Sequence, residues 1–135
     1  MYSNILIPVV LVGGQGSRAS FQAAKALAGE GAKFTVMHVM EDIPAYVAAQ
    51  IPEEVRAQSR AETKEALRAK AAELPGATVA LDHGHAARAI LEHAEKHGID
   101  CIVLASHKPG LSNLLIGSTA DRVVRHAQCA VHVIR

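Results

Sequence analysis

Runs of apolar residues, separated by polar segments that contain glycine, divide this chain of 135 residues. Residues 4–10 are almost continuously apolar and rich in β-branched side chains, which is typical of a strand buried on both faces of a parallel sheet. Four further runs predict strands at residues 33–40, 77–82, 99–105 and 130–134. Apolar residues at helical spacing predict helices at residues 19–28, 52–74, 86–97 and 118–127. Strands that alternate with helices in this way predict an α/β fold with a parallel sheet and right-handed crossovers.

Glycine, proline and capping residues mark the expected ends of these elements. Ser17 is the expected N-cap of the first helix, and Gly29 and Gly31 are expected to end it. Residues 41–51 are predicted to be an irregular connection. The long helix that follows carries many charges beside a weak apolar stripe, so it is expected to be half exposed. The stripe consists of Val55, Ala66, Leu67, Ala71 and Leu74.

Composition narrows the class of protein. The length predicts one domain, residues 1–135, and aromatic residues are only 3% of the chain, so the core must be built from aliphatic residues and alanine. The net charge is +1 and the basic residues are not clustered, which argues against a nucleic-acid interface. Neither a membrane span nor a signal peptide is recognisable. The two cysteines, Cys101 and Cys129, form no CxxC motif, which favours a reduced, cytoplasmic protein.

Candidate chemistry lies in the loops that follow the two most apolar strands. In open α/β sheets the ligand site lies beyond the carboxyl ends of the strands, at the topological switch point. Gly117, Ser118 and Thr119 open the last helix, and a helix N-terminus attracts anions. Lys108, in the same loop, could meet phosphate oxygens or be an ordinary solvated lysine. Equally, Ser118 could cap its own helix, since Asp121 follows at capping-box spacing.

Other motifs are weaker. Residues 14–19 fit G-x-G-x-x-A, with Glu41 where a ribose-binding acid would stand, but five short strands leave no room for a second mononucleotide half. His93 and His97 share a helix face, and residues 82–85 gather three potential metal ligands without a further one. No nucleophile motif or P-loop is present, so neither a catalytic residue nor a metal site is predicted.

Several segments together resemble one known family. They are ILIPV at the start, VMHV, GHAARAIL, IVLASH, and GSTADRVVRHAQCAVHVIR at the end. The chain resembles the universal stress proteins over nearly its whole length. The resemblance implies a single-domain, Rossmann-like open sheet of five parallel strands in the order 3-2-1-4-5, with helices on both faces, similar to the adenine nucleotide alpha hydrolases. It also implies a cytoplasmic homodimer that pairs through its last strand, at Val131, His132 and Val133.

The resemblance further implies an adenine nucleotide, ATP or AMP, with or without Mg²⁺, bound as a regulatory ligand without turnover. Nucleotide-binding members carry G-x-x-G, a spacer and G-[ST]. Gly117 and Ser118 match its end, whereas Ala105 and Lys108 replace the two earlier glycines. The loop resembles instead a branch with Ser-His-Arg-Pro at this place. Val10 stands where the family usually has an acid that helps to hold the adenosine.

The expected nucleotide site therefore lies between the ends of the first and fourth strands. Its predicted residues are Pro8, Val9, Val10, Val39, Ala105, His107, Lys108, Gly117, Ser118 and Thr119. Two alternatives stay open. One is a nucleotide-free interaction module, which Val10 and Ala105 favour. The other is weak ATP hydrolysis or self-phosphorylation at Ser118, for which the sequence offers no identifiable general base.

Overall fold

Five parallel strands form one sheet in the order β3-β2-β1-β4-β5, which confirms the expected topology. The computed structural model describes residues 1–11, 17–106 and 116–135. The strands are β1 (Tyr2–Pro8), β2 (Ala28–Met40), β3 (Thr78–His83), β4 (Cys101–Ala105) and β5 (Ala130–Ile134). β1 and β4 pair directly, as predicted for the two most apolar strands, and Ile5 stands opposite Cys101.

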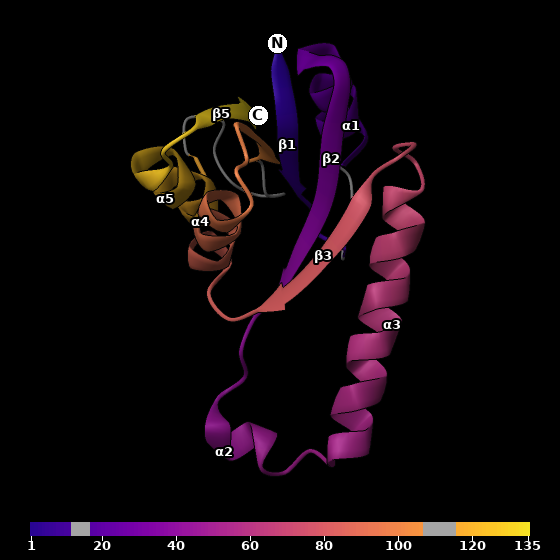
Figure 1. Ribbon diagram of the computed structural model, residues 1–135. Helices are drawn as coiled ribbons and strands as arrows, with labels where there is room; N and C mark the ends of the chain where they lie inside the picture. Colours follow the sequence, from indigo (N-terminus) through magenta and orange to yellow (C-terminus); the bar gives the residue numbers. More distant parts are fainter. Residues whose placement is uncertain (12–16, 107–115) are drawn as a thin grey trace.

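Helices cover both faces of the sheet, as expected (Figure 1). They are α1 (Ser17–Leu27), α2 (Ala45–Ala48), α3 (Glu53–Ala71), α4 (Ala86–Lys96) and α5 (Ser118–His126). α1 and α3 lie on one face, and α4 and α5 lie on the other. No helix among the described residues is both long and apolar enough to cross a membrane.

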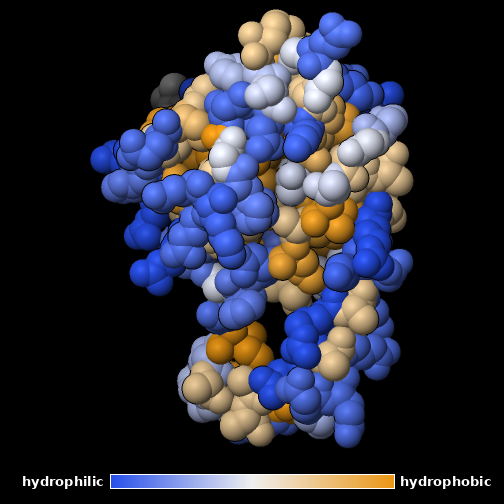
Figure 2. Space-filling model, in the orientation of Figure 1, coloured by the Kyte–Doolittle hydropathy of each residue, from blue (hydrophilic) through white to orange (hydrophobic). Residues whose placement is uncertain are grey.

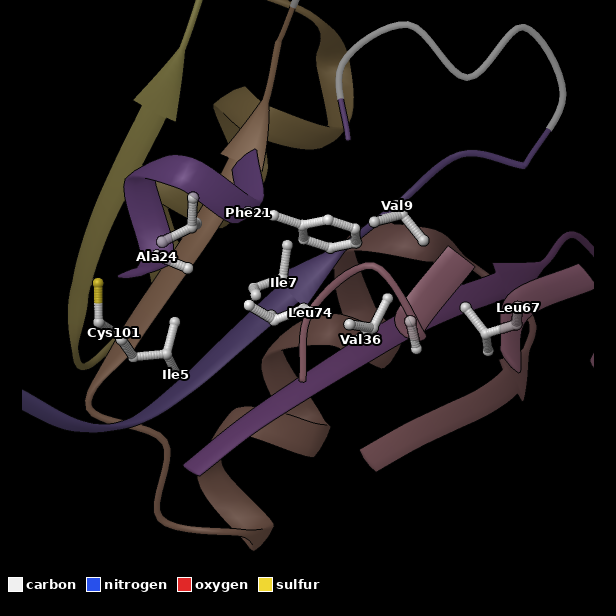
Figure 3. Packing of buried hydrophobic residues seen from close by; sticks show 11 residues of the cluster. Ile5, Ile7, Val9, Phe21, Ala24, Val36, Leu67, Leu74 and Cys101 are labelled. Atoms are coloured by element: carbon white, nitrogen blue, oxygen red, sulfur yellow. The ribbon is translucent and has the colours of Figure 1, made fainter. Parts of the chain in front are cut away.

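Two clusters of buried side chains hold the layers together. Ile5 and Ile7 of β1 pack on one face with Phe21 of α1 and Leu67 of α3 (Figure 3). Leu6, which lies between them in sequence, points to the opposite face and packs in the cluster that holds α4 and α5. Because successive side chains of a strand alternate between faces, a sheet covered on both sides needs continuous apolar runs. This requirement explains why the residues of β1 form a continuous apolar run near the beginning of the sequence.

The beginning of β2 differs from the sequence prediction. β2 starts at Ala28, directly after α1, so Gly29 and Gly31 lie inside the strand. Ala28 pairs with Tyr2 before a shift in register. A Cβ atom on Gly29 would lie 3.0 Å from the Met1 side chain and 3.4 Å from the Tyr2 carbonyl oxygen. Gly29 therefore permits a close approach between the two strands, a role that sequence alone did not separate from helix termination.

The connection from β2 to α3 also differs, since it contains the short helix α2 where an irregular segment was expected. α2 has no buried residue, and in α3 only Leu67 and Ala71 are buried. Val55 and Ala66, predicted for the apolar stripe, are exposed. α2 and the first turns of α3 thus form a lobe that stands away from the sheet (Figure 1). The space-filling view shows a hollow between this lobe and the rest of the molecule (Figure 2).

Candidate functional site

A cleft of about 530 Å³ opens where the carboxyl ends of β2 and β3 face the beginning of α5. Three segments that are distant in sequence build it. Its lining residues are Glu41, Asp42, Gly84, His85, Ala86, Ser118, Thr119 and Arg122. This position, beyond the carboxyl ends of parallel strands, is the one that open α/β sheets use for ligands.

The turn between β3 and α4 forms one wall. The Gly84 N–H donates to the Met40 carbonyl at 2.8 Å, which ties the turn to the end of β2. Gly84 has φ +110°, a conformation that favours glycine. A Cβ atom there would also lie 3.7 Å from Asp42 Oδ2. The turn delivers His85 to the cleft at the residue before α4, and its ring makes no capping hydrogen bond to that helix.

The beginning of α5 forms the opposite wall. Gly117 is the N-cap residue, with φ −59° and ψ 152°, and no side chain among the described residues caps the helix. The hypothesis that Ser118 caps the helix is therefore wrong, because Ser118 is already its first helical residue. Asp121 pairs instead with Arg125, at 3.1 Å between Oδ1 and Nε. The Ser118 side chain is exposed at the cleft, and beside it lie the N–H groups of the first helical turn, which have no partner within the helix.

Charges of both signs line the cleft. Glu41 and Asp42 follow β2, and Arg122 lies one turn after Ser118 on α5. Arg122 Nη1 lies 3.3 Å from His85 Nε2, and Asp42 Oδ1 lies 3.2 Å from His83 Nδ1. A guanidinium and helix N–H groups bind anionic oxygens, whereas carboxylates accept hydrogen bonds from hydroxyl or amino groups. The cleft therefore suits a ligand that carries an anionic group and hydrogen-bond donors.

Only some of the residues predicted from sequence lie at this cleft. Ser118 and Thr119 line it, and Gly117 lies next to them. Val9 lies in the core cluster, where Phe21 points toward it (Figure 3). The Val9 main chain is also occupied, since its N–H donates to Met37 at 2.8 Å and its carbonyl oxygen lies 3.0 Å from His38 Nδ1.

The other predicted residues lie near the ends of strands. Pro8 ends β1, Val10 is 66% exposed beyond it, and Ala105 is the exposed last residue of β4. Val39 is half-buried and packs against the cluster beneath α4 and α5. The predicted residues His107 and Lys108 lie outside the residues that the structure describes.

Sequence reasoning missed Asp42 and Arg122 altogether. It considered Glu41 only as part of a dinucleotide-binding motif, and His85 only as a potential metal ligand in the turn at residues 82–85. The available signal was the spacing of Arg122, four residues after Ser118 and hence on the same helix face. Among residues 1–11, 17–106 and 116–135, no group of three or more His, Cys, Asp or Glu residues could hold a metal ion.

The remaining candidate residues lie outside the cleft. His93 and His97 do share a face of α4, and their rings stack with centroids 4.0 Å apart. Burial, and then the nearby charge of His97, lower the pKa of His93 below its ordinary 6.5. Burial raises the pKa of the Cys101 thiol to about 11, so that group stays protonated and unreactive at neutral pH.

Comparison with known proteins places the chain in a family. The model of the universal stress protein family matches residues 1–135. The chain belongs to the universal stress protein family. Universal stress protein A homolog 2 of Coxiella burnetii is 30% identical over 140 aligned positions, which cover 99% of this chain and 95% of the relative. Other curated relatives match a smaller part of the chain. The match to universal stress protein MJ0531 of Methanocaldococcus jannaschii is 43% identical and covers 38% of this chain and 31% of that protein.

Solved structures of this family share the fold. Universal stress protein UspA from Lactobacillus plantarum superposes with a TM-score of 0.78 at 28% identity, covering 99% of this chain and 98% of that one. A universal stress protein in complex with cAMP has a TM-score of 0.63 at 17% identity, covering 99% of this chain and 97% of that one. The sheet described above is thus the architecture of universal stress proteins.

Proposed function

We propose that this universal stress protein binds an adenine nucleotide, ATP or AMP, as a regulatory ligand and does not turn it over. The cleft at the ends of β2 and β3 is the observation that carries the proposal. It joins Arg122 and the first turn of α5, which suit phosphate, to Glu41 and Asp42, which suit ribose hydroxyl or adenine amino groups. That a related universal stress protein is found in complex with cAMP supports an adenine nucleotide as the ligand.

In this proposal the nucleotide spans two groups of residues. Ser118 and Thr119, with Gly117 beside them, hold the phosphates, and Lys108 and His107 approach from the preceding loop. The base and ribose lie toward Val39, Glu41 and Asp42, with Ala105 and the segment from Pro8 to Val10 on the side of β1 and β4. The sequence Ser106-His107-Lys108-Pro109 supports assignment to the branch with Ser-His-Arg-Pro, in which a basic side chain replaces a glycine of the phosphate loop. Mg²⁺ would accompany ATP rather than AMP, because a divalent ion neutralises adjacent phosphates.

We also propose that the protein acts in the cytoplasm, as a single domain and as a homodimer, and that nucleotide binding changes its contacts with partners. β5 supports the dimer, since it ends the described sheet and its outer edge is available for pairing. Hydrolysis or self-phosphorylation would require a general base beside Ser118. Incubation with labelled ATP, with Ser118→Ala as the control, is expected to give neither labelled phosphate nor labelled protein.

A second candidate function is a nucleotide-free interaction module, which Val10 favours. Val10 is 66% exposed in the place of the family's acid, so an adenosine there would lack a charged hydrogen-bond acceptor. Such a loss costs about 1 to 2 kcal/mol, or roughly a five- to thirtyfold loss of affinity.

Isothermal titration with ATP, ADP and AMP, with and without Mg²⁺, separates the two functions. It compares the native chain with Val10→Asp and with Val55→Asp, a matched control on the outlying part of α3 that is 53% exposed. Binding by the native chain and by Val55→Asp supports the nucleotide proposal. Binding by Val10→Asp alone makes the native chain a nucleotide-free module. Absence of heat with all three proteins overturns the nucleotide proposal.

A further inference from the structure

A contact between His85 and Arg122 links two walls of the cleft. His85 lies in the turn before α4, and Arg122 lies on α5. Arg122 Nη1 is 3.3 Å from His85 Nε2, and both residues line the cleft. The family assignment gives no role to this pair. Because the His85 ring makes no capping hydrogen bond to α4, the guanidinium is the partner that the structure gives it.

This contact requires a neutral imidazole. An arginine side chain only donates hydrogen bonds and keeps its charge at every ordinary pH. His85 Nε2 must therefore accept, which it does when the ring proton is on Nδ1. A protonated imidazole carries N–H groups on both nitrogens and cannot accept. Protonation of His85 would thus remove the hydrogen bond to Arg122 and place two positive charges side by side.

A second histidine, His83, contacts Asp42, which lines the cleft. His83 Nδ1 lies 3.2 Å from Asp42 Oδ1, so a charged His83 pairs more strongly with that carboxylate. Both side chains are largely exposed, and the pair is correspondingly weak. Pairing would neutralise one of the two carboxylates of the cleft. The two histidines therefore shift the cleft in the same direction, toward positive charge, as the pH falls.

We propose that His85 is a positioning residue for Arg122 and makes anion binding in the cleft depend on pH. Neutral His85 holds the guanidinium against α4. Charged His85 releases it and adds its own positive charge, so that a phosphate ester binds more tightly at about pH 5.5 than at about pH 7.5, the range in which histidines change charge. The inference rests on the proposed function, in that a phosphate-bearing ligand occupies the cleft.

Other charged groups face His85 from the elements around it, and the experiment must separate them. Glu92 lies 3.8 Å from Arg88, measured between Oε1 and Nε, so these two largely offset each other. His126 is a further histidine that lines a pocket together with His85 and Arg122, and it therefore needs a control of its own. Within the part of the chain that the structure describes, the charged and titratable groups around His85 are Glu41, Asp42, Arg88, Glu92, Glu95, Arg122 and His126.

The test measures AMP affinity by isothermal titration at about pH 5.5, 6.5 and 7.5 and constant low ionic strength. It compares the native chain with His85→Gln, whose amide oxygen can accept from Arg122 at every pH and so imitates neutral His85. The phosphate of AMP itself titrates near pH 6, and the ratio of native to variant affinity at each pH cancels that effect. We expect this ratio to rise about three- to fivefold from pH 7.5 to pH 5.5.

Four further variants assign the effect. Arg122→Gln is expected to weaken AMP binding and to abolish most of the rise that depends on His85. Arg125→Gln removes a charge from the same helix, where it pairs with Asp121, and should leave affinity and pH profile close to native. His83→Gln and His126→Gln should retain most of the rise. Parallel pH profiles for the native chain and His85→Gln would overturn the proposal.

A measurement without ligand keeps this proposal separate from the proposed function. Nitrogen-15 NMR signals of the Arg122 side chain, recorded over the same pH range, should change in the native chain and stay constant in His85→Gln. Signals that are constant in both proteins overturn the positioning role, whatever AMP does. If the native chain binds no AMP at any pH, the proposed function fails, and the NMR comparison alone decides whether His85 holds Arg122.

Discussion

Gly117, at the beginning of α5, lies close to Ser106, the residue that follows β4. A Cβ atom on Gly117 would lie 3.1 Å from the Ser106 carbonyl oxygen. Ser106 cannot easily retreat, because it is buried and its N–H donates to Ile134 at 2.9 Å, which fixes it to β5. The backbone angles of Gly117 suit any residue, so this contact rather than conformational strain favours glycine.

Gly117→Ala is therefore expected to lower the free energy of unfolding by about 1 to 2 kcal/mol, the usual cost of overpacking. It should also weaken nucleotide binding, since relief of this contact displaces the beginning of α5, which lines the cleft. Urea unfolding and titration with AMP measure the two effects. Ser118→Ala is the matched control for stability alone, because it changes the neighbouring side chain without this contact. Native stability in Gly117→Ala would mean that α5 adjusts without cost.

Some residues of the cleft owe their position to local sequence, and others owe it to the arrangement of the strands. The anion-binding character of Ser118 and Thr119 follows from their place at the start of a helix, which local sequence reveals. Asp42 and His85 reach the cleft only because β2 and β3 are neighbours and end at the same edge. The family resemblance implied the strand order 3-2-1-4-5. To bring Asp42 and His85 together from sequence, the turns that follow β2 and β3 must also be placed side by side in that order. His107 and Lys108 stay predictions.

At the scale of elements, Asp100 joins the beginning of β4 to the beginning of β1. Its Oδ2 accepts from the Ser3 N–H at 2.8 Å and the Ser3 hydroxyl at 3.0 Å, and its Oδ1 accepts from the Asn4 N–H at 3.0 Å. Burial by itself would raise the pKa of Asp100. Together, the hydrogen bonds from Ser3 and Asn4 outweigh the effect of burial and hold the pKa of Asp100 below its ordinary 3.8.

Asp100→Asn is expected to lower the free energy of unfolding at pH 7 by about 1 kcal/mol, because charge-assisted hydrogen bonds are lost at a site open to solvent. A carboxylate whose folded pKa is lowered stabilises the protein above its unfolded pKa, and that stability is lost as the pH falls through the folded pKa. The difference between native chain and variant should therefore shrink below pH 3.8.

Urea unfolding followed by circular dichroism at neutral pH and at about pH 2.5 checks this expectation. Asp121→Asn is the control, since Asp121 pairs with Arg125 at an exposed helical position. A difference between native chain and Asp100→Asn that is the same at both pH values would show that the charge of Asp100 is not its cause.

Elements inside the layered core were the most predictable from sequence. β5 was predicted with its observed bounds, and α4 and α5 each ended one residue earlier than expected. The side chains of α4 and α5 face the sheet on one side, so hydrophobic periodicity reports the burial of these two helices directly. α2 was not predicted because it buries nothing, and β2 was predicted too short because glycines weaken the strand pattern at its beginning.

At the scale of the whole molecule, the described sheet ends with β3 on one side and β5 on the other. Edge strands invite pairing with another chain unless charged residues or a covering element prevent it. β3 ends in Asp82 and His83, and α3 packs beside it. β5 reads Ala-Val-His-Val-Ile, without any Lys, Arg, Asp or Glu. Of the two edges, β5 is therefore the one suited to pair with a second copy.

A dimer formed through β5 about a two-fold axis brings the middle of the strand opposite its own copy. His132 is that middle residue and is exposed, whereas Val131 and Val133 pack against the core. His132→Glu should place two like charges across the interface and weaken the dimer about fivefold, with the fold intact. Analytical ultracentrifugation measures the dissociation constant, and His126→Glu, an exposed change near the end of α5, is the matched control. A native chain that stays monomeric at high micromolar concentration would overturn the dimer itself. Equal dissociation constants for both variants would place the contact elsewhere than at β5.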